Sequence, residues 1–167
     1  MSGLPFFMEG VKIVPGLSNQ QCSVAGATDR ISLEGYKRVA VFIAVRQGNA
    51  NATDITFHKS TTDGTTVEDT SNMMTHFWTM EDVTVGTTAD TWTKGTAAAT
   101  FSTSASGSGT SYYLIDIGAD ELPDSTSQVY KFIEVNTAGG HASNYLDVVF
   151  FLYQPRYMGA TMPTAQS

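Results

Sequence analysis

The feature that most constrains this chain is a nine-residue run, residues 38–46, that is apolar on both faces of an extended strand. One face carries Val39, Val41, Ile43 and Val45, the other carries Ala40, Phe42 and Ala44, and an arginine stands at each end. Side chains alternate between the two faces of a strand, and β-branched residues favour the extended backbone. The pattern therefore predicts a central strand that is covered on both faces.

Four further segments show strand patterns, at residues 54–60, 111–117, 128–135 and 145–153. In residues 54–60, Ile55 and Phe57 alternate with polar side chains, and the turn-forming segment 47–51 separates them from the first run. This spacing predicts an antiparallel hairpin. Residues 61–111 are rich in Thr, Ser and Gly, and predict short strands and long loops. Residues 118–124 predict one helical turn, stopped by Pro123.

Short strands separated by turns, with no amphipathic helix, predict an all-β fold. We expect a single antiparallel β-sandwich, jelly-roll-like, because 167 residues suit one core. Prolines and glycines interrupt both ends of the chain. The expected organisation is an extended N-terminal arm at 1–17, a β-sandwich domain at 18–153 and an extended C-terminal tail at 154–167.

The net charge and the apolar segments narrow the class of partner. The chain carries a net charge of −7, and its nine Lys and Arg residues do not cluster. Phosphate binding needs clustered cations, so we expect no nucleic-acid partner. No apolar run approaches the length that spans a bilayer, and no targeting segment is visible, so we expect no membrane partner. The single cysteine, Cys22, excludes an intrachain disulfide and is compatible with assembly in a reducing cytoplasm.

No catalytic or cofactor motif stands out, so we expect no enzyme activity, no cofactor and no metal site. His58, His76 and His141 are too far apart in sequence to form a helical metal pair. An acidic cluster is formed by Asp116, Asp120, Glu121 and Asp124. It favours a solvated, capped turn, with a calcium site or a carboxylate pair for glycoside hydrolysis as alternatives. Candidates for a sugar-stacking platform are Trp78, Trp92, Tyr112 and Tyr145.

Several segments taken together resemble a family of virion proteins. They are Leu33–Val39, Tyr113–Ile117, Tyr130–Val135 and Tyr153–Tyr157. In this order and spacing they are similar to small virion proteins encoded near the capsid genes of tailed bacteriophages, including β-sandwich decoration, or cementing, proteins. The resemblance covers most of residues 28–157, while the Thr-rich segment 61–111 is longer than that family's pattern.

The resemblance implies a structural protein that binds the outer surface of a phage capsid and stabilises the shell. Its partner would be the major capsid protein, its place the exterior of the virion, and its own state a homo-oligomer, with a trimer preferred. The apolar arm and the tail, rich in residue types that interfaces favour, supply the expected capsid or subunit contacts. These are Leu4, Phe6, Phe7, Met8, Arg156, Tyr157, Met158 and Met162. A tail or head–tail connector component and a glycan-binding β-sandwich module remain alternatives.

Overall fold

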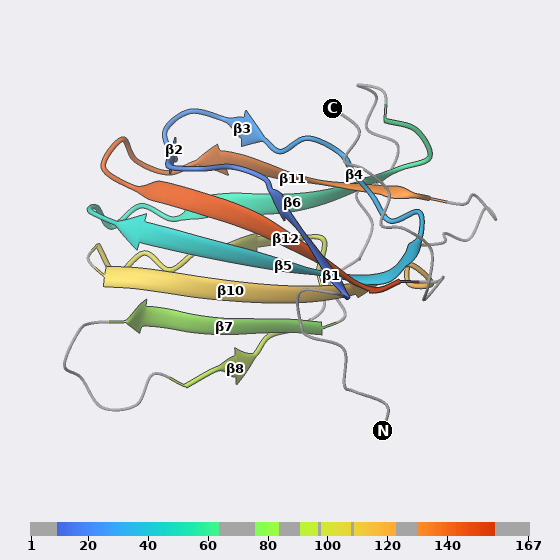
Figure 1. Ribbon diagram of the computed structural model, residues 1–167. Coiled ribbons are helices and arrows are strands. Elements are labelled where there is room, and N and C mark those ends of the chain that lie inside the picture. The colour runs from blue at the N-terminus through green and yellow to red at the C-terminus, as the bar shows by residue number, and fades with distance from the viewer. Residues whose placement is uncertain are drawn as a thin grey trace.

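The computed structural model arranges the chain as two antiparallel sheets that pack face to face (Figure 1). It describes residues 10–63, 76–83, 91–96, 98–107, 109–122 and 130–155. Every paired strand in these ranges runs antiparallel to its neighbours, and none of these residues lies in a helix. In the described ranges no helix is long and apolar enough to cross a membrane. The predicted all-β sandwich is confirmed.

Sheet A forms the near layer in Figure 1 and contains the longest strands. Its order is β1 (Val11–Pro15), β12 (Tyr145–Pro155), β5 (Tyr36–Gln47), β10 (Gly109–Gly118), β7 (His76–Val83) and β8 (Thr93–Lys94), with β2 (Gln20–Gln21) also paired to β12. Sheet B lies behind it, in the order β3 (Gly26–Ala27), β11 (Phe132–Gly139), β6 (Thr53–Ser60) and β9 (Thr100–Ser102), with β4 (Ile31–Ser32) also paired to β11.

The core lies between the two sheets and consists of every second residue of the long strands. Sheet A contributes Val39, Val41, Ile43 and Val45 from β5, Tyr113, Ile115 and Ile117 from β10, and Leu146, Val148, Phe150 and Leu152 from β12. Sheet B contributes Ile55, Phe57, Ile133 and Val135. All of these side chains are buried. Burying each one stabilises the fold by roughly 1.5–3 kcal/mol relative to exposure.

The predicted hairpin between residues 38–46 and 54–60 is wrong. These segments form β5 and β6, which lie in opposite sheets, so the turn between them crosses the sandwich. Both edges of β5 are already paired, with β10 on one side and β12 on the other, along nearly the whole strand. These two long apolar partners bury more surface beside β5 than the shorter, polar-faced β6 would.

The two ends of the domain also differ from the expectation. Residues 11–15, assigned to the arm, form the edge strand β1, where Ile13 pairs with Phe151 of β12. Pro15 fits there because an edge strand tolerates a residue without an amide hydrogen. Strand β12 runs to Pro155, slightly beyond the expected domain boundary. The predicted helical turn is a hydrogen-bonded turn in which Glu121 donates to the carbonyl of Gly118, and Pro123 lies outside the described residues.

Asn144 holds the crossing from β5 to β6 in place. Its side chain is fully buried, and its Oδ1 accepts hydrogen bonds from the amides of Gly48 and Asn49, both at 2.9 Å. Its Nδ2 donates to the carbonyls of Asn49 at 3.1 Å and Asn51 at 2.8 Å. One amide group therefore satisfies four backbone groups of a turn that has no sheet partner of its own.

Replacing this residue tests its role. We expect Asn144→Ala to lower the free energy of unfolding by about 3 kcal/mol, because it leaves partly buried backbone groups without partners. Urea denaturation followed by circular dichroism measures this change. Asn51→Ala, at an exposed position of the same turn, is the control and should change stability by less than about 0.5 kcal/mol. Equal effects of the two substitutions would contradict the assignment.

Candidate binding surface

The outer face of sheet A, which points away from sheet B, is apolar across its centre. One row of paired residues crosses five strands and consists of Pro15, Val149, Phe42, Leu114 and Trp78. The neighbouring rows add Ile13, Phe151 and Ala40 on one side and Ala44, Tyr112 and Met80 on the other. These eleven residues are called the apolar face below.

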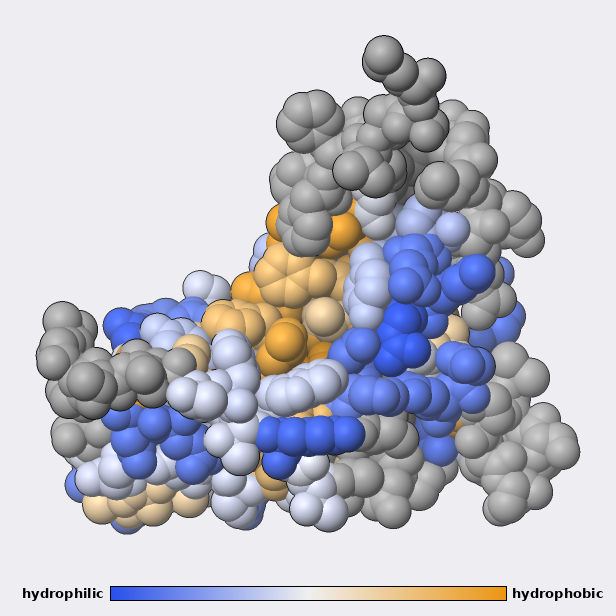
Figure 2. Space-filling model, turned by 90° about the horizontal axis from the view of Figure 1, so that it is seen from below, coloured by the Kyte–Doolittle hydropathy of each residue, from blue (hydrophilic) through white to orange (hydrophobic). Residues whose placement is uncertain are grey.

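The apolar face is partly open to solvent. Ile13, on the edge strand, is 43% exposed, and the other large side chains of the face are half-buried. Figure 2, seen from the β8 side, shows hydrophobic residues gathered in one area that hydrophilic residues border. Monomeric soluble proteins rarely expose a contiguous apolar area of this kind, and such areas mark interaction surfaces.

Ring contacts order the side chains of the face. The rings of Phe42 and Tyr112 stack with their centroids 5.7 Å apart. Trp78 stacks on the ring of His76 at 6.1 Å. Aromatic pairs in offset, stacked arrangements stabilise each other and restrict their rotamers. The face is therefore a partly ordered surface before any partner arrives.

An ionic cluster closes one end of the apolar face. Arg38 Nη2 lies 3.0 Å from Asp116 Oδ2 and 3.8 Å from Glu121 Oε2. The hydroxyl of Tyr153 donates to Asp116 Oδ1 at 2.6 Å, and His76 Nδ1 lies 3.5 Å from Glu121 Oε1. The hydrogen bond that Arg38 donates to the carboxylate of Asp116 raises the pKa of the guanidinium. Burial, followed by the hydrogen bond to Asp116, raises the pKa of Tyr153 to about 12.

A second polar group closes the other end. The guanidinium of Arg46 donates to Asn19 Oδ1 and lies over the ring of Tyr145, 5.7 Å from its centroid. The backbone amide of Asn19 donates to Asp147 Oδ1 at 2.6 Å. The face thus has an apolar centre between two polar ends, each with an arginine of β5. This is the anatomy of a protein interface, with a hydrophobic core and a polar rim.

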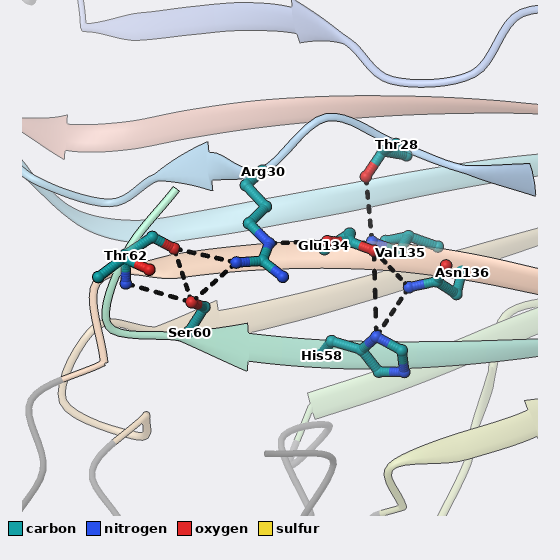
Figure 3. Close-up of polar contacts among 8 residues, drawn as sticks. All are labelled: Thr28, Arg30, His58, Ser60, Thr62, Glu134, Val135 and Asn136. Atoms are coloured by element: carbon teal, nitrogen blue, oxygen red, sulfur yellow. Dashed lines mark hydrogen bonds and ion pairs between the residues drawn. The ribbon is translucent and has the colours of Figure 1, made fainter. Parts of the chain in front are cut away.

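The outer face of sheet B has the opposite character (Figure 3). Arg30 Nε pairs with Glu134 Oε2 at 2.9 Å, and these side chains are only 7% and 14% exposed. Asn136 Nδ2 donates to Glu134 Oε1 at 2.6 Å and lies 2.8 Å from His58 Nδ1. These polar groups satisfy one another within the sheet, which leaves this face suited to water rather than to an apolar partner.

The contact residues expected from the sequence fall outside the described residues. They are Leu4, Phe6, Phe7, Met8, Arg156, Tyr157, Met158 and Met162. Their attachment points are described, because β1 and β12 lead to the two segments. Val11 pairs with Tyr153, so residues 1–10 and residues 156–167, called the arm and the tail from here on, both join sheet A at the end that carries the Arg38 cluster.

The histidines and carboxylates considered in the sequence analysis lie in different parts of the fold. His58 lies on sheet B, His76 on β7, and His141 in a turn where its Nδ1 accepts from the amide of Ser143. Of the acidic cluster, Asp116 and Glu121 meet on Arg38, Asp120 is exposed and Asp124 lies outside the described residues. Within the described ranges, no group of three His, Cys, Asp or Glu side chains is placed to hold a metal ion.

The sequence signal for the apolar face was present but incomplete. A run that is apolar on both sides predicted a strand covered on both faces, yet among the described elements only sheet B covers β5, on one face. Leu114, Val149 and Phe151 were not singled out as binding residues. The sequence shows that these residues alternate with core residues. Their alignment with Phe42 in one surface depends on how β10 and β12 are registered against β5, which the sequence does not reveal.

The tyrosine of the rim gives a pH test. The pKa of Tyr153 is about 12 in the folded protein and 10 in the unfolded chain. Its protonated hydroxyl therefore stabilises the fold fully below pH 10, and this stabilisation is lost as the pH rises towards 12. Burial also raises the pKa of Tyr113 and Tyr36, so the wild-type free energy of unfolding should fall over this range. We expect a shallower fall in Tyr153→Phe, measured by urea denaturation at successive pH values. Tyr145→Phe, on the same strand and face, is the matched control. Equal slopes in wild type and Tyr153→Phe would contradict the role of this hydroxyl.

No protein-family model and no curated protein matches this chain. The surfaces described above are therefore the observations from which a function can be inferred: an apolar face with a polar rim on sheet A, a self-satisfied polar face on sheet B, and two chain ends that leave sheet A together.

Proposed function

We propose that this chain is a structural, non-enzymatic subunit of a tailed-bacteriophage particle that binds the outer surface of the capsid shell and stabilises it. The contrast between its two outer faces carries the proposal. Sheet A presents the apolar face, and sheet B presents paired ions and amides. A subunit with this asymmetry has one side suited to burial in an assembly and one side suited to solvent.

The position of the chain ends supports the mode of binding. The arm and the tail leave sheet A from neighbouring positions, because Val11 and Tyr153 are paired. Two apolar segments that start side by side can contact adjacent shell subunits together. Once one segment is bound, the second is held at a raised effective concentration, which strengthens attachment without a larger domain interface. On this proposal the major capsid protein is the partner.

A binding experiment with shells of the virus that encodes this chain tests the proposal. We expect the purified protein to co-sediment with expanded shells at a fixed stoichiometry, and to raise the temperature at which the shells come apart. The double variants Phe6→Ser/Phe7→Ser and Tyr157→Ser/Met158→Ser should each weaken binding at least tenfold. Thr56→Ser, on the outer face of sheet B, should bind as the wild type does. A folded wild-type protein that does not bind shells would overturn the proposal.

The same experiment separates a shell protein from a tail or connector component. Electron microscopy of the native particle shows where the chain sits. Copies arranged on the icosahedral lattice support the shell proposal. Copies confined to a ring or a tube would replace it with the tail or connector alternative.

A glycan-binding role is the second candidate, and one observation favours it. Of the four aromatic residues singled out from the sequence, Trp78, Tyr112 and Tyr145 share the outer face of sheet A. Trp92, which precedes β8, is 40% exposed. If these rings stack on sugars, the protein should bind members of a glycan array at millimolar or lower concentration, and Trp78→Ala should abolish that binding. An array without binding removes this candidate.

A further inference from the structure

We infer that the apolar face of sheet A is covered by the same face of a second copy of this chain, so that the subunit is a face-to-face dimer. The inference deepens the proposed function, on which its biological role rests, by naming the occupant of the apolar face. Shell attachment is left to the arm and the tail, which leave sheet A at one end. The observations that favour a second copy are the width of the face, its charge and its side-chain chemistry.

The dimensions of the face match what a stable interface needs. Its central row crosses five strands, and on β5 the outward residues run from Arg38 to Arg46. With strands about 4.8 Å apart and a rise of about 3.4 Å per residue, the apolar face together with its two polar ends covers roughly 24 Å by 27 Å, or about 650 Å². Each partner in a protein interface of standard size contributes about 800 Å². A second sheet of equal width covers this face fully.

The charge of the face permits a copy of itself to approach. The chain carries a net charge of −7. On the outer face of sheet A and at its ends, however, positive and negative charges balance. Arg38, Arg46 and Lys94, which pairs with Trp78, offset Asp116, Asp147 and Glu121 of the ionic cluster, so these formal charges sum to zero. Two acidic copies repel each other over most orientations, and this neutral face removes that repulsion. Each end of the face carries both positive and negative side chains. A two-fold axis therefore does not place two ends of a single charge sign against each other.

The side chains of the face suit a protein sheet better than a sugar. Leu114 and Val149 flank Phe42 in the central row, so aliphatic side chains lie beside the aromatic rings and Leu114 separates Phe42 from Trp78. Aliphatic groups gain by burial against other apolar side chains. Two sheets pack about 10 Å apart with their strands within about 30° of each other, and interdigitate side chains of this type. A two-fold interface uses the same patch on both copies, as an open sheet face allows.

Sedimentation velocity on the full-length chain tests the inference. The wild type should sediment as a species of about twice the 17.9 kDa chain mass at micromolar concentration. Leu114→Lys puts a cation at the centre of the face and should raise the dimer dissociation constant at least 100-fold. The matched control is Thr56→Lys, also half-buried on the outer side of a central strand, but in sheet B. It should remain dimeric. Circular dichroism and the urea midpoint of each variant establish that it is folded.

Crosslinking places the interface without disturbing its centre. Cys22 is buried, so a cysteine introduced on the surface supplies the accessible thiol. Ala44→Cys, on the apolar face, should give a covalent dimer with a short bismaleimide, whereas Ala27→Cys, exposed on β3 of sheet B, should not. Crosslinking of both positions to the same extent would contradict a dimer through sheet A.

The failures of the two proposals are distinguishable. A wild type that remains monomeric at 100 µM, a trimeric mass, or a dimer that Leu114→Lys leaves intact overturns the dimer inference, even if the protein binds shells. A dimer that Leu114→Lys separates, from a protein that does not bind shells, supports the inference and overturns the shell proposal. If a different partner covers the apolar face, the wild type will be a monomer that binds that partner, and Leu114→Lys will abolish this binding. That result also overturns the dimer inference.

Discussion

The strict alternation of side chains along β5 is the constraint on which the rest of this structure depends. Successive residues of a strand must point to opposite sides, and here both sides are apolar, with Val41 and Ile43 on one and Phe42 on the other. Sheet B shields the first side. The second side remains as the apolar face, because β10 and β12 follow the same alternation beside β5. A strand of this kind leaves an apolar face that a further layer or a partner can cover.

Polar groups are placed where they do not compete with this apolar surface. On sheet B, outward residues of β11 such as Glu134 and Asn136 pair with each other and with Arg30, which lies between β3 and β4. On sheet A, the outward charged groups of β5, β10 and β12 lie at the two ends of the face, where Asp116 is held by Arg38 and Tyr153, and Lys94 of β8 lies at the edge beyond Trp78. A buried polar group is tolerated only with partners. The distribution therefore leaves the centre of sheet A free of groups that a partner would have to desolvate.

Much of the fold follows from local patterns, and the errors have a common cause. The all-β class and most long strands could be predicted, because period-two alternation and β-branched residues act locally. The hairpin between β5 and β6 was predicted wrongly, because the turn sequence does not reveal that both edges of β5 are taken by strands far along the chain. The strand at Val11–Pro15 was missed for a similar reason, since its partner β12 lies at the opposite end of the sequence.

The sequence by itself determined which residues alternate and which segments are extended. It also determined that β5 has apolar side chains on both faces, more than one buried face requires. The tertiary structure decided which of those side chains meet: Phe42, Leu114, Val149 and Trp78 come from four strands that are distant in sequence, and they form one row only through strand order and register. The physical reason is that alternation is a property of each strand's backbone, whereas strand pairing is chosen by the free energy of burying whole faces together. A single shift of register by one residue would have sent the same side chains to the core.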